Sequence, residues 1–221
     1  MPTSSVARAA YGLTALCAVA GLAISLVLTI SDPDSFPAAD PGLFGPGDTL
    51  GRVSDWAMYF TYWSNALVAV VFGVLALAPR ERGRGFRVLL LDALLMISVT
   101  GIVYAAILAP VAPPREGWEV VGNALVHYIV PPLAVLAFAA FGPRGWLERR
   151  LIPLALVIPV VWIVLTYARG AVTDAHPYGF INVVALGYPV ALINTGVILL
   201  IGIALCFVLI GIDRLARRWS G

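Results

Sequence analysis

The sequence predicts an all-α, polytopic membrane protein, a bundle of six transmembrane helices with its N and C termini on the cytoplasmic side. Of the 221 residues, 61% are hydrophobic and 12% are charged, and the mean hydropathy is +0.94. A soluble domain needs a charged, solvated surface that this composition cannot supply. Spans of about 20 residues each leave little room for a soluble unit, so residues 1–221 are predicted to form a single membrane domain.

Apolar runs recur between clusters of proline, glycine and arginine, and each can cross a bilayer as a helix that satisfies its own backbone hydrogen bonds. The first run follows Arg8 and is longer than a signal-peptide core, which predicts an uncleaved span. The fifth is the shortest and carries Pro153 and Pro159. A β-barrel is disfavoured because alternation at strand period is missing. The predicted spans are 9–30, 58–78, 88–109, 122–141, 151–167 and 187–212.

Arginine placement predicts the orientation. All 14 basic residues are arginine. Eleven fall near the two termini or in the loops after the second and fourth spans, while Arg52, Arg115 and Arg169 fall on the other side. The positive-inside rule makes the arginine-rich side cytoplasmic. The net charge of +2 is thus explained by topology, and the predicted partners are membrane lipids, with no nucleic acid.

Two outer loops and two cysteines complete the outline. The first outer loop, 31–56, is long and rich in proline, glycine and aspartate, and it is either a lid over an outward-facing cavity or a solvated spacer. His176, in another outer loop, is expected to be solvated. Cys17 and Cys206 lie far apart and lack metal-ligand spacing, so no metal site is predicted.

Polar residues inside two spans indicate a possible site, because polar groups are costly in a bilayer. Thr61, Ser64 and Asn65 share one helix face, and Asn123 and His127 share another, since residues three and four apart are neighbours. At about 1.5 Å per residue, Thr61 lies about 4 to 5 Å and His127 about 7 to 8 Å inside the outer boundary. We therefore expect the two side chains to lie at the same level.

A hydroxyl and an imidazole at one level are the parts of a nucleophile and base pair. A threonine hydroxyl becomes reactive when a histidine takes its proton, and Ser64, Asn65 or Asn123 could stabilise the oxyanion or orient the pair. The alternative is a non-catalytic transporter, lipid-binding or scaffold protein, in which Thr61 bonds its own helix and His127 joins two helices.

Two further residues add local predictions. Pro131 stands four residues after His127 and removes the helical donor to the His127 carbonyl, which predicts a kink or a bound water. Arg169 lies on the outer side against the charge rule. It either binds a lipid carboxylate or phosphate or reaches to the interface.

Three stretches resemble bacterial six-span membrane proteins that are distantly related to the androgen-induced-gene family of membrane threonine hydrolases. They are YFTYWSN at 59–65, HYIVP at 127–131, and TYARG at 166–170 followed by Tyr178. In that family a threonine and a histidine on different helices split fatty acid esters of hydroxy fatty acids, and Thr61 and His127 occupy the matching motifs.

This resemblance implies an intramembrane lipid-ester (fatty acyl ester) hydrolase in the bacterial cytoplasmic membrane, with a hydrophobic acyl ester as substrate and no cofactor. Arg169, Tyr128 and Tyr178 lie in or beside the matching stretches and are predicted to bind the substrate.

Overall fold

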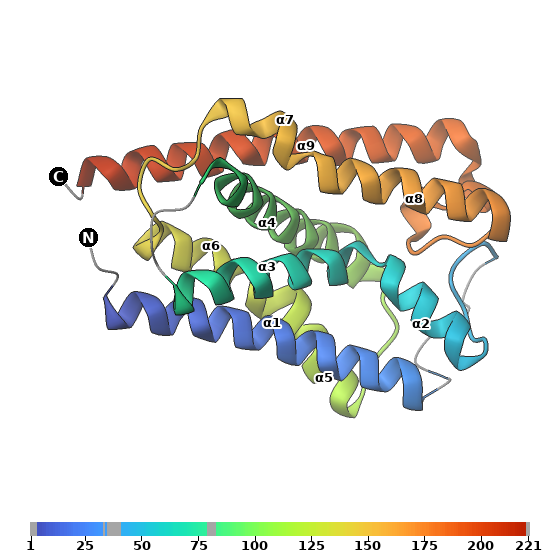
Figure 1. The fold of residues 1–221 in the computed structure, drawn as a ribbon. Coiled ribbons are helices and arrows are strands. Elements are labelled where there is room, and N and C mark those ends of the chain that lie inside the picture. The colour runs from blue at the N-terminus through green and yellow to red at the C-terminus, as the bar shows by residue number, and fades with distance from the viewer. Residues whose placement is uncertain (1–3, 33, 35–40, 79–82, 220–221) are drawn as a thin grey trace.

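The computed structural model describes residues 4–32, 34, 41–78 and 83–219, which form a bundle of long helices (Figure 1). Six helical segments are long and apolar enough to cross a membrane, and no strand forms among the described residues. The predicted all-α, six-span fold is confirmed. The spans are Ser5–Ser31, Phe60–Leu77, Arg84–Val111, Gly117–Phe141, Arg149–Thr173 and Val183–Arg218.

The second span begins later than predicted. Helix α2 (Thr49–Met58) ends at Met58, and α3 (Phe60–Leu77) begins after Tyr59, whose extended backbone (φ −71°, ψ 127°) separates the two helices. Asp48 caps α2 by accepting a hydrogen bond from the Gly51 N–H at 2.7 Å, the usual role of aspartate at a helix start. The break places Thr61 in the first turn of α3.

The fifth span is longer than predicted and is interrupted. It consists of a 3₁₀ turn (Arg149–Leu151), α7 (Ile152–Ala155) and α8 (Val157–Thr173), with a break at Leu156. Pro159 has no N–H to donate to the carbonyl of the residue four positions earlier, so a regular helix is weakened at this point. The longest helix, α9 (Val183–Trp219), changes direction at Gly187, where φ is +72°.

Helix α4 (Arg84–Val103) forms the centre of the bundle. In Figure 1 it runs between the pair formed by α1 (Ser5–Ser31) and α3 and the pair formed by α8 and α9. Every residue from 90 to 97 is at most 2% exposed. The fourth span, made of α5 (Gly117–Ala124), the π-helix η4 (Leu125–Ile129) and α6 (Val130–Phe141), packs against α1 and α4.

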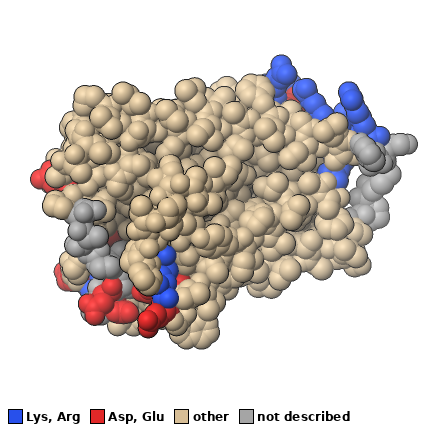
Figure 2. Space-filling view, turned by 180° about the vertical axis from the view of Figure 1, so that it is seen from behind, with Lys and Arg blue, Asp and Glu red and all other residues tan. Residues whose placement is uncertain are grey.

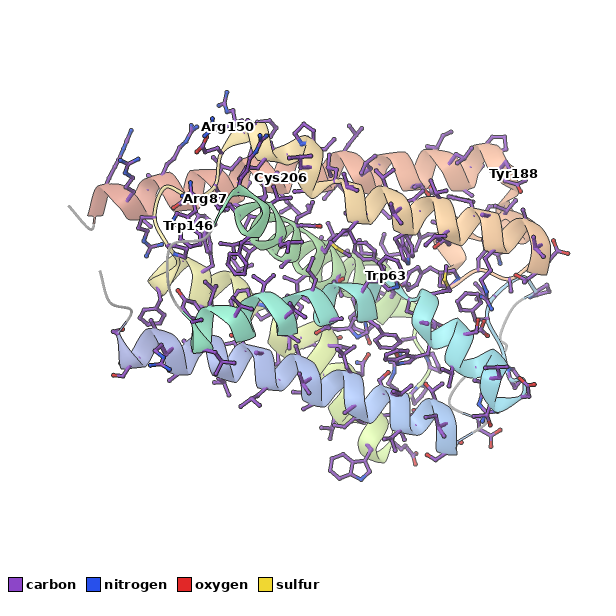
Figure 3. All side chains as sticks on the ribbon, viewed as in Figure 1. Trp63, Arg87, Trp146, Arg150, Tyr188 and Cys206 are labelled. Carbon is purple, nitrogen blue, oxygen red and sulfur yellow. The ribbon has the colours of Figure 1, made fainter. Side chains whose placement is uncertain are left out.

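The two ends of the bundle differ in charge. Both chain termini lie at one end (Figure 1), which we call the terminal end; the other is the distal end. Figure 2 shows most of the visible basic atoms at the terminal end, most of the acidic atoms at the distal end beside a few basic ones, and a broad uncharged band between them on this face. Arg87, Trp146 and Arg150 lie toward the terminal end and Tyr188 at the distal end (Figure 3). Arg80, Arg82 and Asp40 lie outside the described residues.

The described part of the loop 31–56 is anchored to the protein. Arg52 is 5% exposed and donates hydrogen bonds to the carbonyls of Thr29 and Ile30 at the end of α1. The Phe44 N–H donates to the carbonyl of His176 at 3.0 Å, and the His176 N–H donates to Gly42 at 2.8 Å. These contacts anchor Phe44 and Arg52, while residues 46–50 between them are exposed.

The orientation of the bundle is tested by two exposed positions at opposite ends, Glu116 and Arg149. On a background lacking Cys17 and Cys206, an impermeant thiol reagent added outside intact cells should label the Glu116→Cys protein. The Arg149→Cys protein should react after the cells are made permeable, because the arginine-rich end is predicted to be cytoplasmic. The reverse pattern would overturn the predicted orientation.

Candidate functional site

Thr61 and His127 are in contact in the distal half of the bundle. The Oγ1 atom of Thr61 lies 3.1 Å from Nε2 of His127, and Thr61 is 6% exposed. The contact joins the second span to the fourth, as the depth estimate predicts. A nucleophile and a general base must lie within such a hydrogen-bond distance to act together.

Asn123 fixes the orientation of the imidazole. Its Oδ1 atom lies 2.9 Å from Nδ1 of His127, one helical turn along the same span. A carboxamide oxygen is an acceptor, so His127 donates its hydrogen from Nδ1 and keeps the lone pair on Nε2. The Thr61 hydroxyl then donates to Nε2, which is the protonation state that a base toward Thr61 requires.

The π-helix η4 explains how His127 reaches this position. Pro131 and Pro132 lack the N–H groups that would bond to the carbonyls of His127 and Tyr128, and the Val130 N–H instead donates to Leu125, five residues back. Such widened turns are rare and occur often at functional sites. The irregularity expected at Pro131 is thus a π turn that contains His127.

The opposing helix has a matching irregularity. Helix α4 continues into the π-helix η2 (Tyr104–Leu108), which precedes Pro110. The Tyr104 ring stacks on the imidazole of His127 with centroids 3.8 Å apart and an interplanar angle of 17°. The two helices can approach because a Cβ atom at Gly101 would lie 2.8 Å from Cβ of Pro131. Stacking fixes the plane of the imidazole, and Asn123 fixes its rotation within that plane.

Tyr178 approaches Thr61 from the segment between α8 and α9. The Thr61 N–H donates to the Tyr178 hydroxyl at 3.3 Å, and the same hydroxyl lies 3.4 Å from Thr61 Oγ1. Burial raises the pKa of Tyr178 to about 12, so the phenol stays protonated at neutral pH. Because its oxygen accepts from the Thr61 backbone, its hydrogen is available to an oxygen at Thr61.

Ser64 and Asn65 bind backbone groups around Thr61. Ser64 Oγ donates to the Thr61 carbonyl at 2.8 Å and lies 2.8 Å from Thr100 Oγ1. The Asn65 amide donates to the carbonyls of Thr61 and Val126, at 2.8 and 3.2 Å. These bonds engage both amide hydrogens of Asn65. Ser64 and Asn65 therefore orient the start of α3. Their donors already bond backbone carbonyls, so neither residue has a free donor for the oxyanion that it was predicted to stabilise.

An apolar cavity of about 70 Å³ lies beside Thr61, and the described residues that line it carry no charged side chain. Thr61 lines this cavity and also contacts His127, which is not among the lining residues within the described part of the chain. The Thr61 hydroxyl thus stands between a base and an apolar space. The lining residues are Phe60, Thr61, Leu95, Val99, Thr100, Val103, Leu108, Leu156, Pro159, Trp162, Ile163, Tyr178, Phe180, Ile181, Thr195, Ile198, Leu199 and Gly202.

Arg169 lies at the distal end in an ion pair. Its Nη2 atom is 2.6 Å from Oδ1 of Asp55, and its guanidinium lies 4.7 Å from the ring centroid of Phe44. Burial raises the pKa of Asp55 above its ordinary value, against the opposing effect of Arg169. Among the described residues, the Nη1 atom of Arg169 has no hydrogen-bond partner although it is buried. The residue therefore connects α2 to α8 and keeps one donor that no described residue uses.

Tyr128 and His176, two other residues singled out in the sequence, lie in different surroundings from each other. Tyr128 is 51% exposed and packs edge-on against Tyr104, so it lies behind the His127 and Tyr104 stack. His176 was expected to be solvated, and this is wrong: it is buried against Gly170, and burial lowers the pKa of its imidazole. The backbone bonds to Gly42 and Phe44 hold it there.

The described residues contain no group of three or more His, Cys, Asp or Glu side chains that could hold a metal ion. In comparisons with known proteins, no family model, curated protein or solved structure matches the chain. The fold and the site define a six-span membrane protein in which a buried threonine, Thr61, lines an apolar cavity and contacts the partly buried His127, which is paired with Asn123.

Proposed function

We propose that the protein is an intramembrane lipid-ester hydrolase in which Thr61 is the nucleophile and His127 the base. The observation that carries the proposal is the 3.1 Å contact between Thr61 Oγ1 and His127 Nε2 at the wall of an apolar cavity. Asn123 supplies the third member of a nucleophile, base and orienting-group arrangement. The resemblance to membrane threonine hydrolases points to the same pair.

The first half of the reaction forms an acyl-enzyme. Thr61 Oγ1 attacks the ester carbonyl carbon while Nε2 of His127 takes the hydroxyl proton. The carbonyl oxygen becomes an oxyanion. When it collapses, the bond to the alcohol oxygen breaks, His127 returns its proton to that oxygen, and the alcohol leaves. The acyl group is then bound to Thr61 as an ester.

The second half uses water. His127 takes a proton from the water molecule, whose oxygen attacks the acyl carbon, and the bond to Thr61 breaks. Thr61 Oγ1 receives the proton from His127, and the carboxylic acid departs. The sum of both halves is ester plus water giving acid plus alcohol, with the enzyme unchanged.

Two features around Thr61 favour the negative charge that develops on the ester carbonyl oxygen when Thr61 Oγ1 attacks. Thr61 lies in the first turn of α3, an 18-residue helix, and the N-terminal end of a helix stabilises nearby anions. The protonated Tyr178 hydroxyl, 3.4 Å from Thr61 Oγ1, is a hydrogen-bond donor on the cavity side. Donors placed where charge develops supply much of the rate enhancement in acyl transfer.

The proposed substrate is a hydrophobic acyl ester that enters sideways from the outer leaflet of the bacterial cytoplasmic membrane. The uncharged lining of the cavity suits an acyl chain, because apolar groups gain by leaving water and charged groups lose by it. Such an ester would enter the cavity from the surrounding membrane lipids. Neither step requires a cofactor.

The catalytic pair is tested by substitution. Thr61→Ala and His127→Ala should each lower kcat/KM for a decanoyl ester about a thousandfold or more, and the double variant should be scarcely worse, because the two act as one unit. Thr61→Ser should keep part of the activity, since it retains the hydroxyl and loses a methyl that restricts the rotamer.

Thr14→Ala is the matched control. Thr14 is as buried as Thr61, and its hydroxyl donates to the Ala10 carbonyl of its own helix at 2.8 Å, so this variant should hydrolyse the ester normally. Full activity in the Thr61→Ala protein would exclude the proposed nucleophile and leave a non-catalytic role for the polar cluster.

The predicted substrate contact of Arg169 is tested by a pair of opposite changes. Arg169→Gln should raise the KM for carboxylate-bearing esters about tenfold and leave neutral esters nearly unaffected, because a charge-assisted hydrogen bond is lost. Asp55→Asn should lower the KM for the carboxylate-bearing class, because it frees the Nη2 atom of Arg169 that now binds Asp55. Equal effects on both ester classes would show that Arg169 serves to hold α2 against α8.

A further inference from the structure

The cavity has its polar groups at one end. The hydroxyls of Thr61 and Tyr178 lie 3.4 Å apart, and both residues line the cavity. Thr100 and Thr195 also line it, but their hydroxyls contact Ser64 and Tyr167. Leu95, Leu156 and Gly202 line it as well and carry no polar side-chain atom. A space with this polarity fits a molecule with a polar head and an apolar tail.

The helices give the depth of the space. The 2.8 Å contact between Ser64 and Thr100 sets α3 beside α4, which run in opposite directions, so Thr61 lies near the level of Val103. Leu95 comes eight residues before Val103 on α4, which places it about 12 Å deeper at 1.5 Å per residue. The cavity therefore reaches about 12 Å from Thr61 toward the terminal end.

Gly202 on α9 closes the deep end opposite Leu95. A Cβ atom at Gly202 would lie 3.3 Å from Cδ1 of Leu95 and 3.7 Å from Cγ2 of Val99. Because glycine has no side chain, α9 can pack close to these two residues. Gly202 is buried. A side chain added here would press against Leu95 and Val99, which line the cavity, and would crowd the deep end.

From this geometry we infer that the cavity is an acyl-chain pocket whose depth selects groups of medium length, with Gly202 and Leu95 as its floor. With bonds of about 1.5 Å, an extended chain advances about 1.3 Å per carbon, so about 12 Å holds about eight to ten carbons. This inference deepens the proposed hydrolase function, and its predictions about ester turnover rest on that function.

The test alters the floor in both directions. Gly202→Leu should lower kcat/KM for p-nitrophenyl decanoate about tenfold, since about two methylene groups lose their burial, and should change the butanoate ester less than twofold. Leu95→Ala should act oppositely and improve the hexadecanoate ester relative to the decanoate. Gly196→Leu is the matched control. Gly196 lies on the same helix as Gly202, and a Cβ atom at Gly196 would meet nothing within 4 Å.

A second readout separates this inference from the hydrolase proposal. Binding of radiolabelled decanoic acid to the purified full chain is measured by dialysis in matched detergent, where Gly202→Leu should weaken binding about tenfold and Gly196→Leu should not. Binding that follows this pattern without any ester turnover would overturn the hydrolase and keep the acyl pocket. Turnover with equal effects of Gly202→Leu and Leu95→Ala on all chain lengths would overturn the pocket and keep the hydrolase. Neither binding nor turnover would overturn both.

Discussion

Inside a bilayer, each backbone N–H and C=O must find a partner within the protein, and this constraint determines where the site lies. Regular helices meet it everywhere except near proline. Before Pro131 and Pro132 the chain widens into the π turn that contains His127, in which the Val130 N–H bonds to Leu125, and the π turn before Pro110 contains Tyr104. The two turns face each other, so their rings stack at 3.8 Å. The imidazole is thereby held with one nitrogen toward Asn123 and the other toward Thr61.

The polar side chains around this pair divide into two groups. Ser64 and Asn65 bind the carbonyl of Thr61, and so stabilise the start of α3 by satisfying buried polar groups. The Thr61 hydroxyl is directed at His127 instead. A threonine in a membrane helix commonly bonds its own helix, as Thr14 does. The different partner of Thr61 is what favours a chemical role over packing.

The sequence was sufficient for the six spans, because length and hydropathy are local properties, and for the shared level of Thr61 and His127, because residues can be counted along a helix. It was not sufficient for helix rotation or for contacts between distant loops. Tyr178 reaches Thr61 across 117 residues, and the burial of His176 depends on pairing with Gly42 and Phe44. No periodicity in the chain signals these contacts, which depend on how the distal segments pack.

The most direct measurement of the central claim is the site of covalent labelling by a fluorophosphonate, mapped by peptide mass spectrometry on the purified protein. A Thr61 hydroxyl activated by His127 should attack the phosphorus, so the adduct should lie on Thr61 and its rate of formation should fall sharply in the His127→Ala protein. An adduct on another residue, or one whose rate does not depend on His127, would contradict the assignment of Thr61 and His127 as nucleophile and base.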